Sequence, residues 1–250
     1  MKMINEGGNI FKTKEGQPLT QRIDRAEVLP TVQWLEKILG IPLVDNMLGT
    51  TGKNPTSGDL DLAVDEKKTT KDDLVSKLTA WCVNNDLDPR DYIRKSGISV
   101  HFKTPIDGDN TRFVQTDLML GDPAWMNFSM QGGAHDSPYK GMHRHILMAS
   151  IAKARGMKWS FSQGLTTRDT GAILSRNPDH IAEYLLGTGA KGSDLASVET
   201  IIAKIKNNPD YDTLVADARE TLTKDGVMLP ESYAPGTAAW FRNMYNLFGQ

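Results

Sequence analysis

The residues most clearly able to do chemistry are two aspartates separated by a single residue, Asp59 and Asp61. They lie within residues 48–65, which read LGTTGKNPTSGDLDLAVD. Alternate side chains of a β-strand share a face, so both carboxylates point one way while Leu60 and Leu62 point into a core. Two neighbouring carboxylates repel unless a cation lies between them, and such oxygen ligands suit Mg²⁺ or Mn²⁺. The pattern therefore predicts a metal site. The alternative is a solvated strand face, or Asp59 acting as a turn cap.

A third carboxylate stands on a later strand-like segment, residues 111–120, which read TRFVQTDLML. Asp117 is the only acidic residue there, and it lies on the face opposite the mainly apolar one. The preceding residues 98–102 alternate apolar and polar side chains, and residues 107–110 suit a connecting loop. A hairpin of this kind could lay Asp117 beside the aspartate pair as a third metal ligand.

A glycine turn precedes the aspartate pair. Residues 43–48 are an apolar segment that predicts a strand, and Gly49, Thr50 and Lys53 follow it in a tight turn. Glycine allows the backbone N–H groups of such a turn to approach a phosphate, which the same metal ion would bind. This context favours metal and phosphate binding over a solvated strand.

The glycine turn with its hydroxyl residue, the strand SGDLDLAV and the later strand with a single aspartate together resemble the nucleotidyltransferase superfamily of DNA polymerase beta. In that family, three carboxylates bind two divalent ions and the glycine turn holds a nucleoside triphosphate. The resemblance implies that Asp59, Asp61 and Asp117 are both catalytic residues and metal ligands. It assigns nucleotide binding to four residues of the glycine loop: Gly49, Thr50, Lys53 and Ser57.

A second, less specific resemblance lies downstream, where residues 137–165 are similar to the thumb segment of family X polymerases. Residues 177–187 are similar to the short helix that follows there, so the two resemblances together cover about residues 43–187. Lys140 and Arg144 would then assist in binding the phosphates, and a solvated helix face is the alternative. The chain as a whole is similar to uncharacterised nucleotidyltransferases encoded by bacteriophages.

The chain also departs from the polymerase pattern. Thr50 replaces the usual serine, and Lys53 is the only basic residue in a loop where family X polymerases often carry paired arginines. Lysine offers one compact charge without the two-pronged hydrogen bonding of arginine. His145 aligns roughly where these polymerases keep an asparagine near the incoming nucleotide. These differences argue against templated DNA synthesis.

The reaction that the resemblance implies is transfer of a nucleoside monophosphate from an NTP or dNTP to a hydroxyl acceptor by in-line displacement, with Mg²⁺ or Mn²⁺ as cofactor. Asp59 and Asp61 would bridge two ions, and Asp117 would bind the ion on the side of the nucleophile. The acceptor stays open among an RNA or DNA end, a protein hydroxyl and a small molecule.

Three other functions stay open. A glycosyltransferase of the Asp-x-Asp type also holds a nucleotide sugar through a metal between aspartates, although the glycine turn and the third carboxylate favour nucleotidyl transfer. A catalytically degenerate relative would bind a nucleotide or a protein partner without a strong need for magnesium. A toxin or antitoxin of the superfamily would modify a protein or a tRNA.

Composition narrows the class of protein. The formal net charge of −2 gives no overall attraction to nucleic acid, so a polyanion would need a local basic patch. The single cysteine, Cys82, excludes an intramolecular disulfide framework and a cysteine-based zinc cluster. No apolar run approaches the length of a membrane span, and residues 1–14 are too polar for a signal peptide. We expect a cytoplasmic protein that binds no membrane, in the host cytoplasm if a phage encodes it.

The hydrophobic pattern predicts an α/β fold, which the resemblance specifies as a polymerase beta-like palm with a mixed sheet and helices on one side. One helix should end at Gly40, and Thr70 with Asp73 should begin another with a capping box. The glycine-rich residues 121–137 predict a loop.

A C-terminal helical subdomain should follow the palm. From residue 193 onward, three apolar stripes at helical spacing predict helices, the last of them over residues 240–248. The expected parts of the chain are an N-terminal arm, the palm and the helical thumb-like subdomain, at residues 1–25, 26–136 and 137–250.

Overall fold

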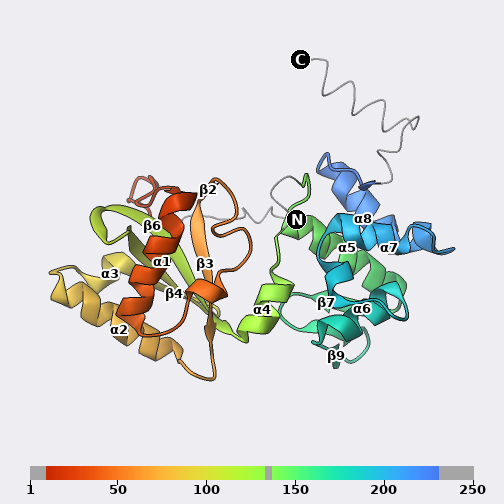
Figure 1. Cartoon of the computed structure of the whole chain (residues 1–250), viewed down its shortest axis with the longest axis horizontal. Helices are drawn as coiled ribbons and strands as arrows, with labels where there is room; N and C mark the ends of the chain where they lie inside the picture. The colour runs from red at the N-terminus through yellow and green to blue at the C-terminus, as the bar shows by residue number, and fades with distance from the viewer. Residues whose placement is uncertain (1–9, 133–136, 231–250) are drawn as a thin grey trace, which may run out of the picture. The chain divides into compact units, whose positions relative to one another are not determined.

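The computed structural model describes residues 10–132 and 137–230 (Figure 1). The chain divides into two compact units, Met1–Met130 and Gln131–Gln250. The division falls close to the boundary expected between the palm and the C-terminal subdomain. The helix predicted over residues 240–248 lies outside the described residues.

A four-stranded mixed sheet forms the centre of the first unit, in agreement with the predicted α/β fold (Figure 1). Its strands are β3 (Asp59–Asp65), β4 (Ile93–Ser96), β5 (Ser99–Ile106) and β6 (Asp109–Gly121). They lie in the order β3-β6-β5-β4, with β3 parallel to β6 and the other neighbours antiparallel. The turn between β5 and β6 has positive φ at Asp107 and Gly108, which suits a tight hairpin.

Two helices, α1 (Arg25–Leu39) and α2 (Lys71–Asn84), cover one face of this sheet (Figure 1). Buried side chains of both helices form one core with Leu60, Leu62 and Val64 of β3. Alternation along β3 therefore directs its apolar side chains toward the helices and its aspartates toward the opposite face, as predicted.

The ends of these helices follow signals in the sequence. Gly40 ends α1 with a φ of 62°, a left-handed conformation that glycine adopts without strain. Thr70 and Asp73 form the predicted capping box at the start of α2. Trp81 of α2 packs edge-on against Trp34, with 5.4 Å between the ring centroids, so its predicted place in the core is confirmed.

Two short helices and a two-stranded sheet complete the first unit. They are α3 (Pro89–Tyr92), α4 (Pro123–Ser129), β1 (Ile23–Asp24) and β2 (Thr56–Ser57). The prediction of a loop throughout residues 121–137 is wrong where α4 forms. The Asp122 carboxylate caps this helix by accepting the backbone N–H of Ala124 at 3.0 Å, and Pro123 fits the first turn.

Residues 43–48 do not form the predicted strand. Val44–Asn46 is a 3₁₀ helix, and Met47 makes only an isolated bridge to β3. The Glu36 carboxylate accepts hydrogen bonds from the first two backbone N–H groups of the segment, at 2.5 and 2.8 Å. Because these donors are already paired, the segment cannot offer them to a strand ladder.

The described part of the predicted N-terminal arm packs into the first unit. Phe11 is 1% exposed, and Ile23 is fully buried in the core that the sheet forms with α1 and α2. The backbone N–H of Gln21 donates to the carbonyl of Phe113, and β1 pairs with β2. The first unit therefore begins well before residue 26.

The second unit combines helices with a three-stranded antiparallel sheet, which the expectation of an all-helical subdomain missed. Gly156, with a φ of 75°, follows the first helix, and short stretches with β-branched and aromatic residues then pair as strands. The helix predicted over residues 177–187 is confirmed as α6. The elements are α5 (Gly141–Ala154), β7 (Met157–Ser160), β8 (Gly164–Thr167), β9 (Ile173–Ser175), α6 (Pro178–Leu186), η2 (Gly192–Leu195), α7 (Val198–Ile205) and α8 (Tyr211–Lys224).

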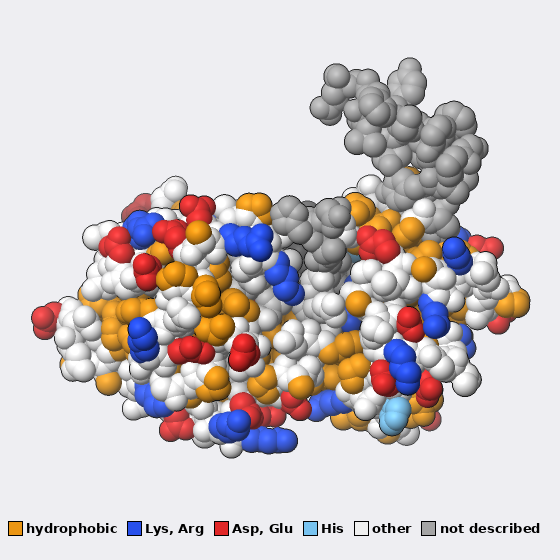
Figure 2. Space-filling view, viewed as in Figure 1, with side chains coloured by type: hydrophobic (Ala, Val, Ile, Leu, Met, Phe, Trp, Pro, Cys, Tyr) orange, Lys and Arg blue, Asp and Glu red, His pale blue; other side chains and the backbone are white. Residues whose placement is uncertain are grey.

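On the face shown in Figure 2, acidic and basic side chains are interspersed, in keeping with the small net charge. Among the helices of the described residues, none has both the length and the apolar character that crossing a membrane requires.

Candidate metal site

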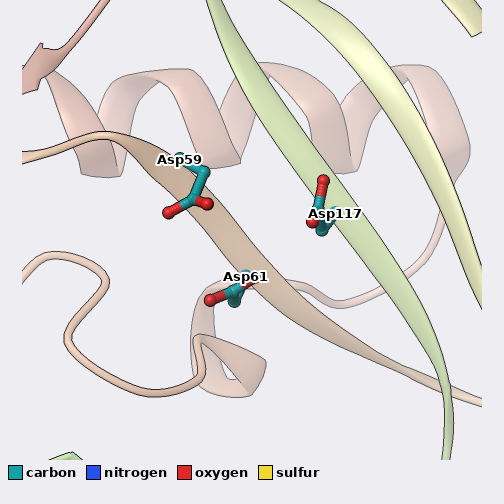
Figure 3. Close-up of side chains that lie close together, drawn as sticks. All are labelled: Asp59, Asp61 and Asp117. Atoms are coloured by element: carbon teal, nitrogen blue, oxygen red, sulfur yellow. The ribbon is translucent and has the colours of Figure 1, made fainter. Parts of the chain in front are cut away.

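Asp59, Asp61 and Asp117 lie close together on two neighbouring strands, β3 and β6 (Figure 3). The parallel pairing of these strands places Asp61 directly opposite Asp117, and Asp59 opposite Gln115. A carboxylate oxygen from each of the three aspartates lies within 4.8 Å of the other two. The predicted meeting of the three carboxylates is confirmed, and the group could hold a metal ion.

Burial and repulsion from neighbouring charges raise the pKa of Asp59 and of Asp61. Burial, and then the charges of Asp59 and Asp117, raise the pKa of Asp61 from its ordinary value of 3.8 to about 7. Burial, and then the charge of Asp117, also raise the pKa of Asp59. A divalent cation would offset this repulsion, and carboxylate oxygens are ligands that Mg²⁺ and Mn²⁺ accept readily. The three residues therefore fit such an ion in chemistry and in spacing.

Two neighbours hold Asp117 in place, and neither was predicted as a site residue. His101 of β5 lies opposite Asp117 in the antiparallel pair, with 2.8 Å between Nδ1 and the Asp117 Oδ1. The Gln115 Nε2 donates to the same oxygen at 3.0 Å. Strand parity could have found Gln115, which lies two residues from Asp117 on β6, whereas finding His101 also needs the register of the β5–β6 hairpin.

The glycine loop is anchored to β3 at the aspartate pair. The backbone N–H of Leu48 donates to the carbonyl of Asp61 at 2.8 Å, and the backbone N–H of Asp61 donates to Thr51 Oγ1 at 3.1 Å. Gly49 has a φ of 58°, which suits the predicted glycine turn. Thr51 is buried, whereas the predicted hydroxyl residue Thr50 is exposed. Thr51 therefore fastens the loop, and Thr50 faces solvent.

The two other loop residues assigned to nucleotide binding differ in their surroundings. Lys53 is exposed, and its Nζ donates to the carbonyl of Gly49 at 2.9 Å, so its charge lies against the loop. Ser57 is 8% exposed and pairs with Ile23 in the β1–β2 ladder. Its Oγ has no hydrogen-bond partner among the described residues. Lys53 is therefore the better placed of the two to reach a phosphate from solution.

Arg22 is a cation close to the aspartate pair that sequence analysis missed, because it falls in the predicted arm. Its guanidinium donates to Thr56 Oγ1 at 3.0 Å and to the carbonyl of Thr56 at 3.1 Å. Burial and Asp117 raise the pKa of Asp59, and the positive charge of Arg22 opposes them. The pairing of β1 with β2 thus adds an arginine near a loop whose own sequence carries only lysine.

The two predicted phosphate-binding residues of the second unit have different environments. Lys140 is exposed just before α5, and its backbone N–H donates to His143 Nδ1 at 3.1 Å. Arg144 is 2% exposed, and its Nε donates to the carbonyl of Leu195. Burial lowers the pKa of Arg144 to about 10. The expectation that Arg144 lies on an exposed basic face is therefore wrong, because its helix position faces the core of the second unit.

No protein-family model matches this chain, and no curated protein matches it either. The fold and the site define the class of protein as one with an α/β unit that carries a candidate three-carboxylate metal site.

Proposed function

We propose that this chain is a metal-dependent nucleotidyltransferase, which transfers a nucleoside monophosphate from an NTP or dNTP to a hydroxyl group. The observation that carries the proposal is the parallel register of β3 and β6, which sets Asp117 opposite Asp61 and near Asp59. A glycine loop bonded to Asp61 lies beside the same carboxylates. The likeness of these residues to the polymerase beta superfamily supports the same function.

The chain would contribute ligands and phosphate-binding groups to this reaction. Asp59, Asp61 and Asp117 would hold Mg²⁺ or Mn²⁺, which when bound supplies positive charge for the attacking hydroxyl and for the departing diphosphate. Backbone N–H groups near Gly49 and the ammonium of Lys53 would hold the triphosphate, since both donate hydrogen bonds to anionic oxygens. The anchoring of the loop at Asp61 would keep these donors at a fixed place relative to the carboxylates.

The surface of the second unit favours a nucleic-acid end as acceptor. Residues 153–176 contain five basic residues and one acidic residue, Asp169, in a chain of formal net charge −2. All five basic residues are exposed, and within the described chain only Lys153 pairs with a carboxylate, that of Asp217. Phe161, which is 53% exposed, lies between β7 and β8, where a ring can stack on a base. The basic residues are Lys153, Arg155, Lys158, Arg168 and Arg176.

A label-transfer assay tests the proposal. The four α-labelled ribonucleotides and the four deoxynucleotides are each incubated with the protein and Mg²⁺ or Mn²⁺, together with RNA, a DNA primer or whole-cell protein. Asp61→Asn should remove labelling. Asp65→Asn, on the same strand, is the matched control that should retain it, because Asp65 lies outside the triad and pairs with Lys68 at 3.6 Å. Labelling at the full rate in Asp61→Asn would overturn the mechanism.

The same assay separates the other functions. No labelling of any acceptor would favour a degenerate relative that binds a nucleotide or a protein partner. Labelling of protein or of tRNA would point to a toxin or antitoxin. A glycosyltransferase of the Asp-x-Asp type gives Asp117 no role, so loss of activity in Asp117→Asn, with nucleotides as donors, argues against it.

A further inference from the structure

We propose that His101 and Gln115 are positioning residues, which hold one oxygen of Asp117 so that the other oxygen faces the metal ions. The inference rests on the proposed function, because it takes Asp117 as a metal ligand. Both side chains bond to Oδ1, at 2.8 and 3.0 Å. No described residue donates to Oδ2, so this oxygen is left for a cation.

The direction of the Gln115 amide is determined by its other hydrogen bond. Its Oε1 accepts the backbone N–H of Ile10 at 2.9 Å, and a backbone N–H can only donate. The amide nitrogen must therefore be the atom that faces Asp117. Gln115 is 4% exposed, so water has little access to either bond. The backbone of Ile10 thereby orients the side chain of Gln115, which in turn bonds to Asp117 at the candidate metal site.

The tautomer of His101 follows from the same reasoning. A carboxylate that binds a metal ion is ionised and only accepts hydrogen bonds, so in the metal-binding state that we propose, Nδ1 carries the hydrogen that lies between His101 and Asp117. His101 is 9% exposed, and its Nε2 is buried without a partner among the described residues. With the hydrogen on Nδ1, the Nε2 atom is an acceptor whose lone pair has no hydrogen bond. Burying such an unsatisfied acceptor costs free energy.

Filling space in the sheet would not require an imidazole at this position. An apolar side chain would occupy the same volume without an unsatisfied nitrogen. A histidine whose one satisfied nitrogen points at a metal-binding carboxylate instead fits an orienting role, as such partners have in other metal sites. Space filling depends on the volume of the ring, whereas orientation of Asp117 depends on the Nδ1 donor. Only the orienting role depends on a donor at the place of Nδ1.

Two substitutions of His101 separate these explanations. His101→Asn keeps an amide donor where Nδ1 stands, whereas His101→Gln places its amide nearer the position of Nε2 and retains more of the volume. Mn²⁺ affinity of the full chain is measured from the electron paramagnetic resonance signal of free Mn²⁺. We expect His101→Ala and His101→Gln to bind Mn²⁺ about tenfold more weakly, or worse, and His101→Asn to stay close to the unmodified chain.

Gln115→Met should also weaken Mn²⁺ binding, because it removes the second donor at similar volume. Thr104→Val is the matched control. Its hydroxyl donates to Thr116 at 2.7 Å in the buried layer on the other face of β5, so Mn²⁺ affinity should not change. Thermal unfolding of each variant without metal identifies any variant that loses its fold.

Several results would overturn the inference. His101→Gln binding Mn²⁺ as tightly as the unmodified chain would do so, and so would His101→Asn binding as weakly as His101→Ala. Long-range ¹H–¹⁵N NMR spectra that place the ring hydrogen on Nε2 would contradict the assigned tautomer. If Asp61→Asn abolishes nucleotide transfer while the His101 and Gln115 variants bind Mn²⁺ normally, the proposed function stands and this inference fails. If the unmodified chain binds no Mn²⁺, both fail.

Discussion

The raised pKa of Asp61 links the candidate metal site to the stability of the first unit. Burial and the charges of Asp59 and Asp117 raise this pKa from 3.8 to about 7, so the folded chain binds the proton more tightly than the unfolded chain. The contribution of Asp61 to stability is therefore fully present below pH 3.8 and is lost as the pH rises through about 7. Without metal, we expect Asp61→Asn to raise the free energy of unfolding by about 1–3 kcal/mol above pH 7, with little effect near pH 4.

Urea unfolding in the presence of a chelator, at several pH values, measures this effect. Asp65→Asn is the control, because Asp65 lies on the same strand outside the triad and should not reproduce the pH-dependent gain. An equal gain for Asp61→Asn at pH 4 and pH 8 would contradict the assignment, since it would show that the stabilisation has another origin than relief of a buried charge.

Lys53 provides a second test at the scale of single residues. Its ammonium is exposed and lies against the carbonyl of Gly49, so it can move a short way to a phosphate at the loop. A hydrogen bond between charged groups contributes about 1.5–3 kcal/mol, so Lys53→Ala should raise the KM for the nucleotide about tenfold or more. Lys67→Ala, which removes an exposed lysine from the loop after β3, should leave KM unchanged. Steady-state kinetics with equal KM values for the two variants would remove Lys53 from the nucleotide site.

At the scale of secondary structure, strand parity carried most of the information about the site. The strand that carries Asp59 is predictable because its apolar residues alternate with acidic ones. The hairpin before Asp117 has a turn at Asp107 and Gly108, whose positive φ angles only a few residue types adopt readily. Together these patterns were sufficient to predict that Asp117 lies beside the pair. Parity could not identify His101, because that assignment needs the register between β5 and β6 to the residue.

The elements that the sequence did not reveal are those decided by contacts with residues outside the segment itself. Residues 43–48 read as a strand, but the Glu36 carboxylate takes their first backbone donors. Residues 1–25 are predicted as an arm outside the palm, yet the bond from Ile10 to Gln115 joins residues that are far apart in sequence. Helix periodicity likewise could not show that Arg144 faces the core of the second unit, because a long polar side chain is ordinarily exposed.

The hairpin turn gives a prediction at the scale of the element. Gly108 has a φ of 77°, and a Cβ added there would lie 3.0 Å from Nε1 of Trp34. Gly108→Ala therefore meets both a strained backbone and a clash with a bulky ring. We expect it to lower the free energy of unfolding by about 2–4 kcal/mol.

Gly97→Ala separates the two causes. Gly97 lies in the turn between β4 and β5 with a φ of 50°, and a Cβ there would have no atom within 4 Å. Backbone strain alone should lower the free energy of unfolding by about 1–2 kcal/mol. Urea unfolding of both variants provides the comparison. Equal losses would mean that contact with Trp34 does not constrain the hairpin that positions Asp117.

At the scale of the whole molecule, the parts of the proposed reaction are divided between the two units. The three aspartates, His101 and Gln115 all belong to Met1–Met130, which has its own buried core. The basic residues at 153–176 belong to Gln131–Gln250. Among the described residues, the proposed metal ligands and their supporting side chains thus belong to one unit, whereas the proposed binding of a nucleic-acid acceptor involves the other.

This division leads to a prediction about a fragment of residues 1–130. Because the core and the register of β3, β5 and β6 are contained within it, the fragment should fold cooperatively and bind Mn²⁺ as tightly as the full chain. It should not bind single-stranded RNA or DNA, since it lacks the basic segment. Circular dichroism, Mn²⁺ titration and fluorescence anisotropy with labelled oligonucleotides measure the three properties. A folded fragment with weakened Mn²⁺ binding would show that the second unit supplies part of the metal site, and a fragment that retains nucleic-acid binding would place the acceptor on the first unit.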